Sequence, residues 1–273
     1  MSLTKPQRVL FNLLQDHSVK IKNTLYYPGP YWDYKTKKIT YWLKKNGLNN
    51  FRSIDSSVGT SYTDGFSVDV RRELGFKGRF LSLFFSLPLV NKIFKKQVDT
   101  ARYLFLEKNF LQGEVLSKSE KIKSLLSKYK IENSVSFGCA KKISFKNIEY
   151  STHYLSFLER IDNLSTFSDF KKINSLMEIG GGYGANIHLL IQNFKNLKKI
   201  FYVDIFPNIF VGTEYLKSHF GNAVKDYSVF CDSDEIRFND DNELEIICIP
   251  NWALEKVKSK IDKFHNCASF QEM

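Results

Sequence analysis

Apolar residues are arranged differently in the two halves of the chain. Up to about residue 165 they recur at helical spacing between turn-rich stretches, which predicts a mainly helical N-terminal region. Helices are expected at 9–14, 39–45, 90–111, 119–129 and 150–161, and loops at 26–34 and 51–66. We therefore expect two parts, 1–165 as a possible substrate-binding or lid region and 166–273 as a second domain.

In the second part, short apolar segments alternate with amphipathic ones. The pattern predicts strands at 175–179, 200–204, 244–249 and 264–268, with helices at 186–194, 209–220 and 252–261. Continuously apolar strands that alternate with helices are typical of a parallel sheet covered on both faces. The expected fold class is α/β, with a Rossmann-like sheet of about four strands in the second domain.

A glycine-rich turn joins the first of these strands to the helix that follows it, in the sequence SLMEIGGGYGA at 175–185. Such a turn lets a ligand approach the backbone, and the N-terminus of the helix favours polar or anionic groups there. Asp204 ends the next strand, where a carboxylate can accept hydrogen bonds from both hydroxyls of a ribose. This spacing predicts a site for an adenosine-containing cofactor.

Two cofactor classes, and a tight turn without a ligand, are compatible with the glycines. Gly180, Gly182 and Ala185 satisfy the GxGxxA form of the dinucleotide fingerprint. Glu178 favours the other class, because a carboxylate at the strand end suits an α-amino group and a sulfonium and is unfavourable beside pyrophosphate. Glu178, Gly180, Gly182 and Gly184 read as ExGxGxG, similar to the first motif of class I methyltransferases that use S-adenosylmethionine.

Charge and cysteine usage bear on partners and location. The 40 Lys and Arg outnumber the 29 Asp and Glu, but the excess is spread as lysine pairs without an Arg-rich stripe, so no nucleic-acid partner is expected. No apolar run approaches the roughly 20 residues that span a bilayer, and the N-terminus lacks the pattern of a secretory signal. The four cysteines show no metal-ligand spacing and are expected as buried thiols, and no metal site is expected. A cytoplasmic protein is expected.

Several segments in order resemble the sugar O-methyltransferase family of bacterial polysaccharide gene clusters. They are GCAKKISFKNIEYSTHYL, MEIGGGYGANIHLL, YVDIFPNIFVGTEYLKSHF, IICIPNWALEKV and HNCASFQEM, which together cover about 138–273. The resemblance implies a methyltransferase that uses S-adenosylmethionine and acts on a hydroxyl of a sugar or nucleotide-linked sugar in polysaccharide biosynthesis. The acceptor is then a small molecule or a glycan precursor.

The same resemblance assigns roles to individual positions. Glu178 and the three motif glycines would hold the methionine part of the cofactor, and Asp204 would bind its ribose. Tyr150 and Ser151 would lie over the cofactor, although a packed ring and a helix cap explain this pair equally well. Gln271 and Glu272 follow the last strand and would contact substrate.

A sugar hydroxyl needs a base or a metal to become a good nucleophile. His265 and Glu272 are the candidates near the expected active edge, and no catalytic residue is assigned. His265 is expected as a surface residue at a strand end, and Glu272 as a group that orients substrate.

The sequence stops just after the fourth expected strand, whereas the resemblance implies further sheet. We therefore expect a truncated product, a fragment, or a first half that supplies substitute structure. Two alternatives therefore stand beside the leading interpretation. One is a catalytically inactive binding protein with the cofactor fold, and the other is a methyltransferase with a different substrate, such as nucleic acid.

Overall fold

The computed structural model describes residues 3–22, 24–53, 120–138, 143–145 and 148–266, with a few isolated positions between 80 and 89. These residues fall into two compact units. The first contains 3–22, 24–53, 136–138 and 163–266, and the second contains 120–135, 143–145 and 148–162. The helix expected at 90–111 and most of the loop expected at 51–66 lie outside the described residues. Among the described helices, none has the length and apolarity needed to cross a membrane.

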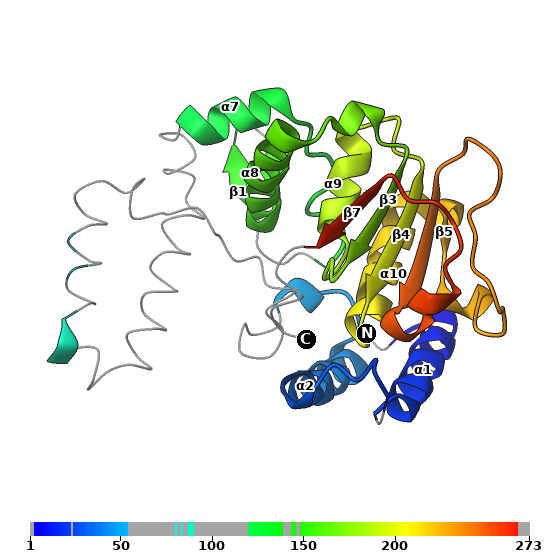
Figure 1. The fold of residues 1–273 in the computed structure, drawn as a ribbon. Helices are drawn as coiled ribbons and strands as arrows, with labels where there is room; N and C mark the ends of the chain where they lie inside the picture. Colours follow the sequence, from blue (N-terminus) through cyan, green and yellow to red (C-terminus); the bar gives the residue numbers. More distant parts are fainter. Residues whose placement is uncertain are drawn as a thin grey trace. The chain divides into compact units, whose positions relative to one another are not determined.

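The first unit is built on a parallel sheet of five strands. They are β3 (Ser175–Ile179), β4 (Lys199–Asp204), β5 (Val224–Lys225), β6 (Glu245–Pro250) and β7 (Lys263–Asn266). The spatial order is β5-β6-β4-β3-β7, and every neighbouring pair is parallel (Figure 1). Every residue of β3 and β6 is buried, as are five of the six residues of β4 between them, so these three strands form the centre of the core. The predicted parallel α/β sheet is confirmed, with β5 as an additional strand.

Two helices follow β3 and β4 as predicted, and the third differs. They are α9 (Ala185–Asn193) and α10 (Asn208–Phe220), and α10 packs on β4, β5 and β6. The helix expected at 252–261 is instead the short 3-10 helix η5 (Asn251–Lys256). It ends there because Val257 is extended and forms a parallel bridge with Ile236.

Two N-terminal helices belong to the same unit as the sheet. The sequence had predicted a boundary at residue 165, with these helices in a separate part. They are α1 (Lys5–Lys20), which begins at a capping box, and α2 (Pro30–Asn46). The prediction of a loop at 26–34 is wrong in its second half, because α2 begins at Pro30. Proline is tolerated in the first turn of a helix, where its missing N–H would have no partner. Phe11 of α1 packs edge-on against Phe206 and Phe210, with ring centroids 5.2 and 5.0 Å apart.

The second unit contains α7 (Glu120–Lys128), the hairpin of β1 (Ile143–Phe145) and β2 (Ile148–Tyr150), and most of α8 (Thr152–Phe167). Ion pairs from Lys121 to Glu159 and from Lys128 to Asp162 connect α7 to α8. The hairpin was not predicted, and Tyr150, which was expected to begin the helix, instead ends β2. The remaining short 3-10 helices, all in the first unit, are η1 (Phe51–Ser53), η2 (Phe170–Lys172), η3 (Gly221–Ala223) and η4 (Tyr227–Val229).

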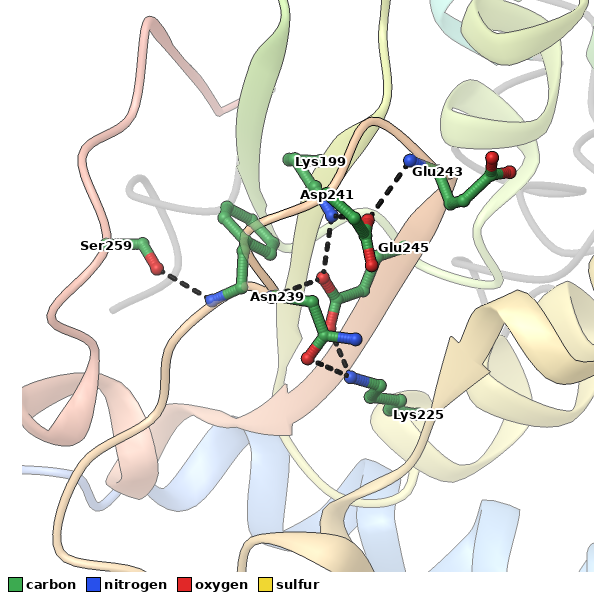
Figure 2. Close-up of polar contacts among 8 residues, drawn as sticks. Lys199, Lys225, Asn239, Asp241, Glu243, Glu245 and Ser259 are labelled. Carbon is green, nitrogen blue, oxygen red and sulfur yellow. Dashed lines mark hydrogen bonds and ion pairs between the residues drawn. The ribbon is translucent and has the colours of Figure 1, made fainter.

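A network of charges closes the amino edge of the sheet, where β4 and β6 begin (Figure 2). The buried carboxylate of Glu245 pairs with Lys225 through one oxygen. Its other oxygen lies 3.1 Å from Lys199 Nζ and accepts a hydrogen bond from the Asn239 N–H at 2.8 Å. Lys199 also pairs with Asp241 at 2.7 Å. Both oxygens of Glu245 are therefore bonded, and the loop before β6 is attached to the sheet.

Two histidines are stacked between α9 and α10. The rings of His188 and His219 lie 3.8 Å apart, and His188 Nδ1 lies 3.0 Å from the Tyr215 hydroxyl. Burial lowers the pKa of His188 to about 2, with His219 and Arg52 adding to the effect, and burial together with Arg52 lowers the pKa of His219 to about 4. Both rings are therefore neutral in the folded protein at neutral pH.

Acid should unfold this protein through the histidine pair. The two pKa values are depressed in the folded state, so their contribution to stability is complete above the ordinary value of 6.5 and is lost as the pH falls below it. Below pH 6.5 each of these histidines is protonated in the unfolded state but stays neutral in the folded state. Each should therefore lower the free energy of unfolding by up to about 1.4 kcal/mol per pH unit. Urea unfolding between pH 7.5 and 5 measures this slope, and His219→Phe should reduce it. A slope that His219→Phe leaves unchanged would contradict the assignment to this pair.

Candidate functional site

The carboxyl edge of the sheet carries the candidate site. The chain places β4, β5 and β6 on one side of β3, and β7 then returns to the other side of β3 (Figure 1). Open α/β sheets bind ligands at such a reversal, outside the carboxyl ends of the strands. The glycine turn follows β3 at this point, and Asp204 ends the adjacent β4. The sheet thus brings together the predicted residues of its two central strands.

The glycine turn requires glycine for its conformation and for its close packing. Gly180, Gly182 and Gly184 have φ values of +75°, +64° and +87°, in the region that side chains rarely adopt. At Gly181 the requirement is steric, because an added Cβ would lie 2.7 Å from Glu178 Oε2. Gly184 then caps α9. The turn therefore presents backbone rather than side chains at these positions.

Glu178 lies beneath the turn with its carboxylate buried and only partly satisfied. Oε1 accepts a hydrogen bond from Asn186 Nδ2 at 2.7 Å and lies 3.0 Å from His265 Nδ1. Oε2 has no hydrogen-bond partner among the described residues, and neither has Asn186 Oδ1. Glu178 is 2% exposed. A buried acceptor without a donor is unfavourable, so this oxygen suits a ligand that brings a donor.

The expectation that His265 is a surface residue is wrong. It lies in β7, is buried, and stands directly opposite Glu178 in the parallel register. Directly opposed residues of neighbouring strands project from the same face, so the imidazole lies against the Glu178 carboxylate. This contact occupies Nδ1 alone, so the base role considered for His265 would fall to Nε2 and stays a prediction.

Asp204 has a structural role that the sequence did not predict. Its Oδ2 accepts a hydrogen bond from the Gly182 N–H at 2.9 Å, and its Oδ1 accepts bonds from the Ile205 N–H and Asn208 Nδ2. Burial raises the pKa of Asp204 to about 7, and the nearby Glu178 adds to the increase, against the effect of these hydrogen bonds. Oδ2 accepts the Gly182 N–H through one of its lone pairs and retains acceptor capacity for a hydroxyl.

Tyr202 and Tyr183 also hold the turn, and sequence reasoning missed both. The Tyr202 hydroxyl contacts the carbonyl oxygen of Gly182 and lies 3.2 Å from that of Asn208. Tyr183, within the turn, packs its ring 5.5 Å from the ring of Phe51, and the Arg52 guanidinium lies 4.9 Å above it. A signal was available for Tyr202, because it is the one hydroxyl-bearing residue of an otherwise apolar strand centre.

A cavity of about 180 Å³ lies at the same edge, beyond the end of β4. Its walls come from α1, α2 and the segments that follow β4 and β6, and they include Tyr27, Lys37, Thr40, Phe206, Asn251 and Trp252. Asn251 Oδ1 and Thr40 Oγ1 are buried and lack a hydrogen-bond partner within the described part of the chain. The cavity therefore combines aromatic walls with two polar atoms that remain available to a ligand.

The other predicted residues belong to the second unit or lie outside the described residues. Tyr150 ends β2 and Ser151 follows it, both buried in the second unit, where Ser134 Oγ accepts a hydrogen bond from the Ser151 N–H at 3.2 Å. Their role over the cofactor stays a prediction. Gln271 and Glu272 lie outside the described residues.

The cysteine prediction is confirmed at one position and wrong at another. Cys248 is buried, and burial raises its pKa to about 12, whereas Cys231 is only half-buried. Cys139 and Cys267 lie outside the described residues.

Comparisons with protein-family models, with curated proteins and with solved structures found no match to this chain. The parallel sheet with its helices places the protein in the class of α/β proteins. Because no relative indicates a function, the geometry of the site is the basis for proposing one.

Proposed function

We propose that the chain is an S-adenosylmethionine-dependent methyltransferase with a class I, Rossmann-like cofactor domain. The observation that carries the proposal is the buried Glu178 carboxylate, whose Oε2 lacks a partner among the described residues directly under the glycine turn. A buried anion at this point attracts a cationic ligand and repels the pyrophosphate of a dinucleotide. S-adenosylmethionine carries an α-ammonium and a sulfonium, so it matches the charge of this position.

The neighbouring groups fit the rest of the cofactor in the order in which the strands lie. Glu178 on β3 would hold the amino-acid part, and Asp204 on β4 would accept a ribose hydroxyl through Oδ2. The cavity beyond β4 would then take the adenine. There, Asn251 Oδ1 is an acceptor for the exocyclic amine, and the Thr40 hydroxyl can donate to a ring nitrogen.

The chain's own contribution to the reaction is positioning. When bound, the cofactor supplies an activated methyl group for in-line displacement, in which orientation provides much of the rate. The buried edge of the sheet fixes the cofactor and excludes water from it. The acceptor hydroxyl belongs to a sugar or nucleotide-linked sugar in this proposal, on the strength of the sequence resemblance, with Gln271 and Glu272 proposed to contact it.

Titration calorimetry of the full chain with S-adenosylhomocysteine tests the proposal. We expect binding by the wild type and an affinity about 10–100-fold lower for Glu178→Gln, because the negative charge that pairs with the ammonium group is lost. Glu243→Gln, which neutralises an exposed carboxylate, is the matched control and should bind like the wild type. A folded wild type that binds NAD but not S-adenosylhomocysteine would instead identify a dinucleotide site. Incubation with labelled S-adenosylmethionine and a panel of nucleotide sugars then tests the acceptor.

A further inference from the structure

We propose that His265 and Asn186 are positioning residues that hold the Glu178 carboxylate so that Oε2 stays available to the cationic end of the ligand. The inference rests on the proposed function, because it assigns a way of working to the same site. It concerns a histidine and an asparagine to which neither the glycine motif nor the sequence resemblance gives a role.

The three side chains meet from three separate elements. Glu178 lies on β3, His265 on the adjacent β7, and Asn186 in the first turn of α9. Asn186 Nδ2 and His265 Nδ1 lie 2.7 and 3.0 Å from the same oxygen, Oε1, and 3.4 Å from each other. The last torsion of a glutamate is otherwise broad. Two contacts to one oxygen therefore select the orientation in which Oε2 faces the glycine turn.

The use of one oxygen alone distinguishes Glu178 from the other buried carboxylates of the sheet. Glu245 at the amino edge and Asp204 on β4 each have hydrogen-bond or ion-pair partners on both oxygens. At Glu178 both partners converge on Oε1, and Oε2 has none in the described part of the chain. A carboxylate that served packing alone would be expected to satisfy both oxygens. The arrangement instead reserves one of them.

The charges around Glu178 also favour a cation at Oε2. Glu178 is close enough to Asp204 to add to the increase that burial causes in the pKa of Asp204, so two buried acidic groups lie at the same edge. A ligand cation at Oε2 would relieve this repulsion as well as supply the missing donor. Orientation of Glu178 should therefore matter for ligands that carry an ammonium group and not for those that lack one.

Selectivity between two nucleosides tests the inference in the full chain. S-adenosylhomocysteine carries the amino-acid part, and 5′-methylthioadenosine lacks it. We expect His265→Leu to weaken binding of S-adenosylhomocysteine about tenfold and to leave binding of 5′-methylthioadenosine unchanged. His265→Asn, whose amide can replace the ring N–H, should restore most of the affinity. Should His265→Leu not fold, Asn186→Ala removes the other donor and carries the same expectation.

The possible results separate the inference from the proposed function. An equal loss for both nucleosides, or no loss for either, overturns the positioning role and leaves the cofactor site standing. A folded wild type that binds neither nucleoside overturns the proposed function and this inference with it. Thermal melts of each variant identify those that are folded before binding is compared.

Discussion

Gly212→Ala should destabilise the protein by about 3 kcal/mol and weaken the candidate site at the same time. Gly212 lies in α10, and a Cβ at this position would stand 2.2 Å from the Tyr202 hydroxyl and 2.5 Å from the ring carbon that bears it. Tyr202 is fully buried on a strand with partners on both sides, so its ring can move aside only at a cost to the surrounding packing. Overpacking of this kind costs up to about 3 kcal/mol. Urea unfolding measures the loss.

The same substitution in a Tyr202→Leu background is the matched control. With the ring removed, the clash disappears, and alanine favours the helix over glycine by about 1 kcal/mol. Gly212→Ala should then be neutral or stabilising. In the wild-type background it should also weaken binding of S-adenosylhomocysteine, because a displaced Tyr202 loses its contact with Gly182. A Gly212→Ala protein as stable as the wild type would contradict this account of the packing.

Glu245→Gln should cost about 3 kcal/mol at the opposite edge of the sheet. Its carboxylate is 4% exposed and is the shared partner of Lys199 and Lys225, so the change leaves two ammonium groups facing a neutral amide (Figure 2). Removal of one partner from a buried ion pair typically costs about 3–5 kcal/mol, and the partial exposure of Lys225 places this case at the lower end. Chemical unfolding at pH 7 gives the difference directly.

Asp241→Asn provides the comparison for this second prediction. Asp241 also pairs with Lys199, but its side chain is 44% exposed, so solvent screens the pair and its loss should cost much less than the loss of Glu245. Although burial raises the pKa of Glu245, hydrogen bonds from Lys225, the Asn239 N–H and Lys199 lower it overall. Its contribution is therefore present above the ordinary value of 4.5 and is lost as the pH falls further. Equal effects of the two substitutions would show that burial does not govern this network.

The sheet was predictable because parallel strands buried on both faces are continuously apolar. The segments at 175–179 and 200–204 carry this pattern, and both became strands with nearly the expected bounds. β5 was missed because two residues are too few to show a period. η5 was mistaken for an α-helix because its amphipathic pattern resembles one, while a distant bridge to Ile236 makes Val257 extended.

The candidate site was predictable only where its chemistry is local in sequence. The glycines and Glu178 lie within one turn, and Asp204 ends the strand that follows. The contacts of His265 depend on β7 lying beside β3 in one particular register, which no local pattern specifies. Asn186 has no mark in the sequence either, because a polar residue at the start of a helix is ordinarily a solvated one. These two positions became informative only once the strand order was known.

The carboxylate of Asp204 has two roles, one in the proposed ligand site and one in the fold. The oxygen proposed to hold the ribose is the same one that accepts the Gly182 N–H and so keeps the glycine turn in place. Selection for a stable fold and selection for ligand binding therefore act on a single atom. A descendant of this protein that no longer bound any cofactor would still be under pressure to keep the aspartate, because the turn depends on it.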